Sequence, residues 1–213
     1  SKIYNIDKIS YSSDLSSIGS ILSSKERHYH LKIDLKNKSL LEKTIEDIKP
    51  DIIIHCAAES HVDRSIEDPS IFIESNIVGT FNLLEAVRKY WNTIDTHKKN
   101  TFRFHHISTD EVFGSLKEDQ FFDEHSNYSP RSPYSASKAS SDHLVSSWNN
   151  TFGIPTLITN CSNNFGPFQF PEKLIPLTIL KAVNGEKIPI YGDGSNIRDW
   201  IFVDDHTKIL LKL

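Results

Sequence analysis

The chain has 213 residues, of which 38% are hydrophobic and 24% are charged, and its formal net charge is −4. This length supports one sizeable core and the beginning of a second lobe. The acidic balance argues against nucleic-acid and anionic-membrane partners, and no apolar run is long enough to cross a membrane. Cys56 and Cys161 fit no metal-ligand spacing and lie in predicted strands. We therefore expect buried thiols, no metal and, with no secretory pattern at the start, a cytoplasmic setting.

Short runs rich in Ile and Val alternate with longer segments of helical period. Strands are predicted at 3–6, 31–35, 52–58, 102–107 and 156–161. Helices are predicted at 38–48, 70–92, 135–151 and 173–184. This alternation is typical of β-α-β units and predicts an α/β fold of the Rossmann type, doubly wound around a mostly parallel sheet.

Two apolar patterns predict how these elements pack. Residues of the helix at 70–92 repeat at spacings of three and four and predict one apolar face. They are Ile73, Ile77, Phe81, Leu84 and Val87. The continuous run Ile52, Ile53 and Ile54 is expected in a strand that is covered on both faces.

The composition of the sequence changes after residue 160, where several prolines and then several glycines occur close together. We interpret this change as the chain leaving the sheet to build irregular walls over its carboxyl edge, where open α/β sheets bind ligands. The prediction is a dinucleotide-binding domain at 1–160. The start of a substrate lobe would follow at 161–213, interleaved with the last strands of the sheet.

Three segments stand where a dinucleotide would need them. Asp7 ends the first predicted strand, and an acid there accepts from both ribose hydroxyls of NAD. Asp34 and Leu35 end the next strand, and the small residues at 57–60 follow the third. An aspartate at a strand end is more often a turn residue or a helix cap. The ordered set is what favours NAD as the cofactor.

A glycine-rich phosphate loop is expected about 20 residues before the ribose-binding acid. With that acid at Asp7, the loop would fall before Ser1. We therefore expect the sequence to be a fragment that lacks the first strand and this loop. The neighbouring strands would then lack a pairing partner, and we expect weak NAD binding by the fragment alone.

Tyr134 and Lys138 are four residues apart, so they share one face of the predicted helix. A lysine cation near a tyrosine hydroxyl favours the phenolate. Such a phenolate can accept a proton from a sugar hydroxyl while the same carbon is oxidised. A helix that carries this pair by chance is the competing interpretation.

Ser108-Thr109-Asp110-Glu111 directly follows the strand at 102–107. Residues past the carboxyl end of such a strand face the ligand crevice. Two adjacent carboxyl groups can divide acid and base work between them. Alternatively, Asp110 caps the following turn and Glu111 is solvated.

Two further polar segments suit a nucleotide sugar. The turn-forming segment 160–167 can hydrogen-bond a sugar or a nicotinamide amide, and the Arg198 guanidinium suits a pyrophosphate. A surface ion pair with Asp199 is the plainer interpretation of Arg198.

Five segments closely resemble the dTDP-glucose 4,6-dehydratases, a family of the extended short-chain dehydrogenase/reductase superfamily. They are residues 108–114, 134–142, 159–167, 170–176 and 197–200. The resemblance runs from Asp7 to about His206. The pair Tyr134 and Lys138 marks only the superfamily, whereas the triplet at 109–111 is far more specific.

The resemblance implies a role for each catalytic residue. Tyr134, supported by Lys138, takes the proton from the 4-hydroxyl as hydride passes to NAD, and Thr109 positions that hydroxyl. Glu111 removes the proton on carbon 5, and Asp110 protonates the hydroxyl that leaves carbon 6. Return of the hydride to carbon 6 gives the 4-keto-6-deoxy sugar.

The resemblance also implies binding residues. Those for NAD are Asp7, Lys8, Asp34, Leu35, Ala57, Ala58, Glu59, Ser60, Ser75, Tyr134, Lys138 and Asn164. Those for the substrate are Ser60, Thr109, Asn163, Lys173, Leu174, Pro189, Tyr191 and Arg198, with Pro189 and Tyr191 against the nucleobase. Relatives imply a homodimer on a four-helix interface, for which the helices near 70–92 and 135–151 are the candidates.

Three alternatives stay open. An epimerase or decarboxylase of the same superfamily needs Tyr134 and Lys138 but has no use for a separate acid and base, so Asp110 and Glu111 argue against it. A UDP-glucose 4,6-dehydratase would use the same chemistry. An inactive NAD-binding fragment is the third alternative.

Overall fold

The computed structural model describes residues 1–19, 27–116, 119–190 and 192–213. These form two compact units, Ser1–Ser10 with Ile18–Asn160 as unit 1, and Tyr11–Ser17 with Cys161–Leu213 as unit 2. The strands of unit 1 are β1 (Ile3–Asp7), β2 (His28–Lys32), β3 (Ile52–His55), β4 (Arg103–Thr109) and β5 (Thr156–Cys161). Its helices are α2 (Lys38–Ile48), α3 (Val62–Glu67), α4 (Pro69–Phe72), the π-helix η2 (Ile73–Val78), α5 (Gly79–Trp91), α6 (Thr96–Thr101), the 3-10 helix η3 (Asp110–Phe113) and α7 (Pro133–Phe152).

The described strands of unit 1 form two ladders. One joins β1 and β2 in parallel, with Ile3 opposite His28 and Asp7 opposite Lys32. The other has the order β3-β4-β5, with β3 and β4 parallel and Ile52 opposite Arg103. Strands that alternate with helices in this way confirm the predicted parallel α/β class.

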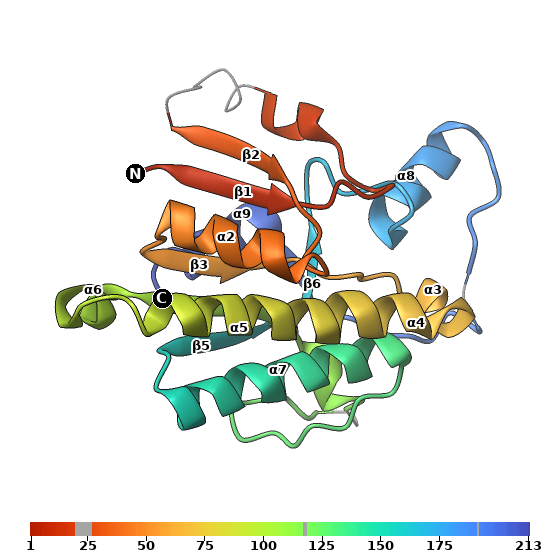
Figure 1. Cartoon of the computed structure of the whole chain (residues 1–213). Helices are drawn as coiled ribbons and strands as arrows, with labels where there is room; N and C mark the ends of the chain where they lie inside the picture. The colour runs from red at the N-terminus through yellow and green to blue at the C-terminus, as the bar shows by residue number, and fades with distance from the viewer. Residues whose placement is uncertain (20–26, 117–118, 191) are drawn as a thin grey trace. The chain divides into compact units, whose positions relative to one another are not determined.

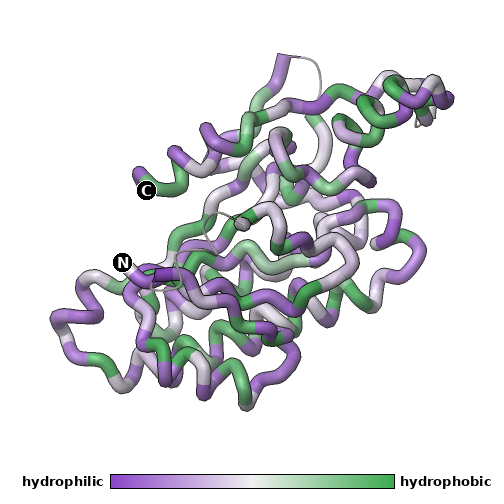
Figure 2. Tube along the Cα trace, turned by 90° about the horizontal axis from the view of Figure 1, so that it is seen from above, coloured by the Kyte–Doolittle hydropathy of each residue, from purple (hydrophilic) through white to green (hydrophobic). Residues whose placement is uncertain are grey.

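Helices α2, α5 and α7 cover one face of these strands, and α5 and α7 run side by side (Figure 1). The core lies between these helices and the strands, and its fully buried members include Leu84, Val87, Phe104 and Val145. The tube alternates between hydrophilic and hydrophobic residues along the helices, as expected for amphipathic elements (Figure 2). In the part of the chain that the structure describes, no helix is long and apolar enough to cross a membrane.

The helix predicted at 70–92 is interrupted by a π-helical stretch. The chain passes from α4 through η2 into α5, and a π-helical turn shifts every later side chain around the helix axis. The predicted apolar face is therefore wrong in its first half, because Ile73 is 46% exposed and Phe81 is 37% exposed. Asn76 takes the buried position instead and is 1% exposed.

Three smaller expectations are corrected. Strand β2 lies at His28–Lys32, so Asp34 and Leu35 fall in the turn before α2, where Asn37 N donates to Asp34 O at 2.9 Å. Side chains alternate along β3, so Ile53 packs on the core whereas Ile52 and Ile54 are 59% and 49% exposed. The second face of this strand is thus open.

The cysteines also differ from the expectation of buried thiols. Cys56 lies one residue past the end of β3 and is exposed, and Cys161 is only partly buried. Residues just past a strand leave the packed layer, which explains the exposure of Cys56.

Unit 2 contains β6 (Asn163–Phe165), α8 (Leu174–Val183), β7 (Trp200–Phe202) and α9 (Val203–Leu210). Strands β6 and β7 are parallel, with Asn163 opposite Trp200. The ring of Phe165 packs against those of Trp200 and Phe202, which adds side-chain contacts between the two strands. The short 3-10 helix η1 (Leu15–Ile18) lies where the chain passes from unit 2 back to unit 1.

Replacing Leu84 by Ala tests the core. Leu84 is fully buried, so we expect Leu84→Ala to lower the free energy of unfolding by about 3 kcal/mol through lost burial and a residual cavity. Leu40→Ala is the matched control, because Leu40 is 41% exposed and should cost less than about 1 kcal/mol. Urea unfolding followed by circular dichroism measures both values. Equal losses would contradict the core assignment.

Candidate active site

The start of α7 is fixed by a capping box. The Ser132 hydroxyl accepts from Ser135 N at 3.0 Å, and the Ser135 hydroxyl accepts from Ser132 N at 3.0 Å. Pro133 occupies the first turn, where its missing N–H costs nothing. These residues set where the helix begins, and they place Tyr134 in its first turn.

Lys138 is 4% exposed, and its ammonium reaches the carboxyl end of β4. Nζ donates to the carbonyl oxygen of Ile107 at 2.8 Å and lies 3.5 Å from His106 Nε2. Tyr134 lies one turn earlier on the same helix face, and its ring meets the edge of Phe72 at 6.3 Å between centroids. The structure thus places Lys138 in a buried position, one turn after Tyr134 on α7.

The triplet Thr109-Asp110-Glu111 lies where β4 passes into η3. Thr109 Oγ1 accepts from Glu111 N at 3.3 Å and lies 3.2 Å from Asp110 Oδ1. Thr109, and not Asp110, therefore caps the turn. Asp110 and Glu111 are both partly exposed, so either carboxyl group can meet a ligand.

Gly114 ends this turn and has a positive φ of 94°. A Cβ at Gly114 would lie 2.5 Å from the carbonyl oxygen of Ser129, so only glycine fits. Ser129 N also donates to Val112 O at 2.9 Å. The segment that follows the triplet is thereby held against the later chain.

Asn76 joins the segment after β3 to the helix that carries Tyr134. Its Oδ1 accepts from Glu59 N at 2.8 Å, and its Nδ2 donates to Glu59 O at 3.0 Å and to Ser137 Oγ at 2.8 Å. Sequence analysis missed Asn76. The available signal was an amide in an otherwise apolar helical pattern, but its partners lie 17 and 61 residues away.

Several of the residues predicted to bind NAD lie together at the ends of β1 and β3. Lys8 forms an ion pair with Glu59, and its Nζ donates to Ser75 Oγ at 3.3 Å. A hollow borders the same cluster. It is lined by Glu59, Arg64, Glu67, Asp68, Ile71 and Phe72.

Asp7 and Asp34 both form turns. Asp7 Oδ1 accepts from Ile9 N at 2.6 Å, and Asp34 Oδ1 accepts from Lys36 N at 2.9 Å. The turn role that sequence analysis left open is therefore present at both positions. Leu35 is held by α5, because its carbonyl oxygen accepts from Asn82 Nδ2 at 3.0 Å.

Most of the remaining predicted residues belong to unit 2. Asn164 Oδ1 lies 2.7 Å from His206 Nδ1, and its Nδ2 donates to Ser162 O at 3.2 Å. Lys173 directly precedes α8, and Arg198 donates to the carbonyl oxygen of Ile197 at 2.8 Å. Asn163 and Leu174 begin β6 and α8, and Pro189 is exposed. Tyr191 lies outside the described residues.

Burial shapes the electrostatics beneath Lys138. Burial, and then electrostatic coupling to His106 and to the Lys138 ammonium, hold the pKa of His55 well below its usual range. Burial also lowers the pKa of His106, against the opposing effect of Asp142. Burial raises the pKa of Tyr128, which hydrogen-bonds Asp142. His55 and His106 are therefore neutral at pH 7, and Tyr128 keeps its proton.

Parallel strands, a buried lysine one turn after a tyrosine, and polar residues at the strand ends define the extended short-chain dehydrogenase/reductase class. Residues 1–213 match the family model described as GDP-mannose 4,6 dehydratase, and the chain belongs to this family. A dTDP-glucose 4,6-dehydratase from Salmonella typhimurium is 52% identical over 217 residues. That match covers 98% of this chain but spans only 60% of the relative.

Solved structures agree with the Rossmann-type fold. The dTDP-glucose 4,6-dehydratase from Bacillus anthracis, in complex with NAD, matches with a TM-score of 0.84 at 40% identity, over 98% of this chain and 61% of that one. The UDP-glucuronic acid 4-epimerase from Bacillus cereus, in complex with UDP-glucuronic acid and NAD, has the same TM-score of 0.84 at 28% identity. The match covers 100% of this chain and 65% of the epimerase chain.

The buried histidines predict a pH dependence of stability. Because His55 and His106 resist protonation when folded, the unfolded chain binds more protons once the pH falls below the ordinary histidine value of about 6.5. We therefore expect the free energy of unfolding to fall with pH below that value, by up to about 1.4 kcal/mol per pH unit for each histidine. Urea titrations between pH 7.5 and 5 measure this slope.

The substitution His55→Asn tests whether the buried imidazole of His55 causes this pH dependence. His55→Asn should reduce the slope of the free energy of unfolding against pH by the equivalent of about one proton. His97→Gln should leave this slope unchanged because His97 is exposed. An unchanged slope in His55→Asn would show that His55 is protonated in the folded protein.

Proposed function

We propose that the protein containing this chain dehydrates dTDP-glucose to its 4-keto-6-deoxy form, with NAD as a cofactor that is regenerated in each turnover. The observation that carries this proposal is a hydrogen bond between the helix that bears Tyr134 and the strand that leads to the proposed acid and base. Lys138, from the helix of Tyr134, donates to Ile107, two residues before Thr109. An acid, a base and a lysine-supported phenol thus share one frame, and only an elimination calls for all three.

The chain's own residues fit NAD. Asp7 ends β1 with an acceptor suited to ribose hydroxyls, and the segment after β3 offers the small residues Ala57 and Ala58 for close backbone approach. Lys8, Glu59 and Ser75 add a polar cluster at the same strand ends. When bound, NAD would supply the acceptor and donor of hydride. Units 1 and 2 are proposed to carry the cofactor half and the start of the substrate lobe.

Three of the five catalytic residues are each assigned one proton transfer. Tyr134 accepts the proton of the 4-hydroxyl, and Lys138 stabilises the resulting phenolate by charge. Glu111 takes the proton on carbon 5, which the 4-ketone has made acidic. Asp110 gives a proton to the hydroxyl that leaves carbon 6, so water departs. The Thr109 hydroxyl, held by its place as a cap, orients the sugar.

Binding of the nucleotide is assigned to unit 2. Asn163, Lys173, Leu174 and Pro189 are the proposed substrate contacts, and Arg198 supplies a guanidinium for the pyrophosphate. Ser60, in unit 1, and Tyr191 complete the proposed substrate set. The proposed NAD set is completed by Asp34, Leu35, Ser60, Tyr134, Lys138 and Asn164. We also propose a cytoplasmic homodimer, on the composition and the family resemblance.

The dehydratase proposal is preferred to an epimerase on two grounds. Identity is 52% to the Salmonella dehydratase and 28% to the Bacillus epimerase. An epimerase also has no use for Asp110 and Glu111 as separate acid and base. Incubating the protein with dTDP-glucose and NAD, and measuring absorbance of the 4-keto product in alkali, tests the proposal. A parallel assay with UDP-glucose decides between the two nucleobases.

Replacing Tyr134 by Phe should remove the first chemical step. Tyr134→Phe keeps the ring contact with Phe72 but loses the group that accepts the proton. We expect product formation to fall at least about 100-fold with little change in substrate KM. A rate within threefold of the wild type would contradict the role of Tyr134.

Replacing Glu111 by Gln should separate oxidation from elimination. Glu111→Gln keeps the shape of the side chain but cannot take the carbon 5 proton. We expect NADH to form in a single turnover, while exchange of that proton with deuterated solvent falls at least about 100-fold. Glu124→Gln, in an exposed loop, is the control and should exchange normally. Unchanged exchange in Glu111→Gln would remove the residue from this role.

A further inference from the structure

Asp142 is a buried carboxylate to which the proposed mechanism gives no task. It lies on α7, four residues after Lys138 and eight after Tyr134, so the three side chains follow one stripe of the helix. Its side chain is 0% exposed. A buried carboxylate is costly unless its oxygens meet donors, so its surroundings show what it holds.

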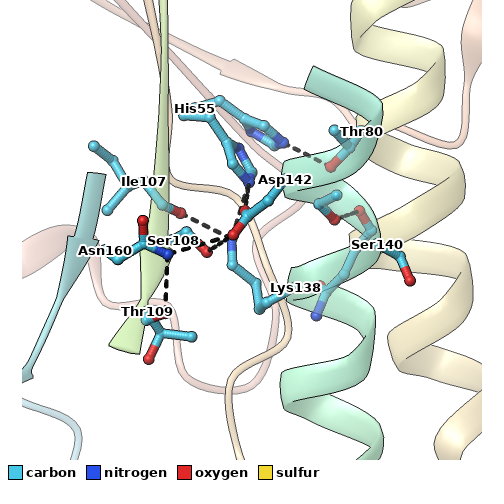
Figure 3. Close-up of polar contacts among 12 residues, drawn as sticks. His55, Thr80, Ile107, Ser108, Thr109, Lys138, Ser140, Asp142 and Asn160 are labelled. Carbon is cyan, nitrogen blue, oxygen red and sulfur yellow. Dashed lines mark hydrogen bonds and ion pairs between the residues drawn. The ribbon is translucent and has the colours of Figure 1, made fainter. Parts of the chain in front are cut away.

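Four side chains from three other segments converge on this carboxylate, and Figure 3 shows it at the centre of the dashed contacts. Ser108 Oγ donates to Oδ2 at 2.7 Å, Tyr128 OH at 3.1 Å and Asn160 Nδ2 at 3.4 Å. Oδ1 lies 3.2 Å from His106 Nε2. These partners come from β4, the loop before α7 and β5.

One side of Asp142 faces Lys138 through an imidazole. His106 Nε2 lies 3.2 Å from the carboxylate and 3.5 Å from Lys138 Nζ. His106 is 1% exposed and neutral, and both charged groups approach the same ring nitrogen. Behind it the ring of His55 lies 5.0 Å away and is tied to Thr80 Oγ1 at 2.9 Å. The ring therefore has little room to turn away.

The other side of Asp142 holds the start of the catalytic triplet. Ser108, which donates to Oδ2, is the residue directly before Thr109. Asn160 Nδ2, which also reaches Oδ2, donates to Thr109 O at 3.1 Å. A single carboxylate thus fixes both the backbone that enters the triplet and the surroundings of Lys138.

We propose that Asp142 is a positioning residue that sets Thr109-Asp110-Glu111 against the pair Tyr134 and Lys138. This inference rests on the proposed dehydration, because it assigns Asp142 the alignment of the acid and base with the phenol on one sugar. A general stabilising role explains the arrangement less well. Buried charges are seldom favourable over apolar side chains, and the donors to Asp142 gather beside the triplet.

Asp142→Asn in the protein at its natural length tests the inference. The amide keeps the shape but replaces one acceptor oxygen by a donor, so either Ser108 and Tyr128 lose their acceptor at Oδ2 or an N–H group takes the place of Oδ1 beside His106. Misplacement of catalytic groups by about 1 Å costs about 100-fold in rate. We expect kcat per folded enzyme to fall at least about tenfold, with KM for dTDP-glucose within about threefold of the wild type.

Ser140→Ala is the matched control, because Ser140 lies on the same helix and donates only to Ala136 O within it, at 2.8 Å. Its kcat should match the wild type. A folded Asp142→Asn protein with wild-type kcat, or with a loss confined to KM, would overturn the inference. If Asp142→Asn does not fold, Ser108→Ala and Tyr128→Phe replace it. A lower kcat in both supports the inference, and wild-type kcat in both overturns it.

Backbone amide hydrogen exchange separates this inference from the proposed function. If the wild-type protein makes no 4-keto sugar, the proposed function fails, but exchange at residues 109–114 still reports on positioning. Asp142→Asn should raise the exchange rates there at least about tenfold, and Ser140→Ala should not. Rates equal to the wild type would overturn the role of Asp142, whatever the reaction.

Discussion

The structure of the candidate site depends on burying the Lys138 ammonium against the end of β4. A buried cation is tolerated only where acceptors meet it, and Ile107 O at 2.8 Å supplies one. Helix α7 can therefore pack on β4 only in the register that brings Nζ to this carbonyl. The same register places Tyr134 one turn before Lys138, and α7 also contacts η3, which follows β4.

Local sequence patterns predicted the framework well, because strands and helices differ in their apolar period. Strand β5 and helix α2 lie where the periodicity placed them, at Thr156–Cys161 and Lys38–Ile48. The π-helical stretch at Ile73–Val78 was not predicted, because no local pattern signals an extra residue in a helical turn. It is stabilised by distant partners, such as Ser141 Oγ, which donates to Asn76 O at 2.6 Å.

The site was predictable where chemistry follows from spacing along the chain. Tyr134 and Lys138 share a helix face because they are four residues apart. Thr109 is the last residue of β4, a strand that the sequence predicted at 102–107. Ser108 and Asp142 were missed as a pair, because 34 residues separate them and only the fold brings them together. The spacing of four between Lys138 and Asp142 was the one local signal, and it predicts a shared face without naming a partner.

In unit 1, the residues that stabilise the fold differ from those that position the candidate site. Its apolar cluster, with Leu84 and Val87 fully buried, supplies the hydrophobic free energy that folds the unit. The joint between α7 and the segments around it is built from small hydroxyls, and Ser137 and Ser141 are 0% and 1% exposed. Small side chains let backbones approach closely, but they bury little apolar area. The geometry of these hydrogen bonds sets the alignment of α7 with the segments around it. Their net contribution to the free energy of folding is small.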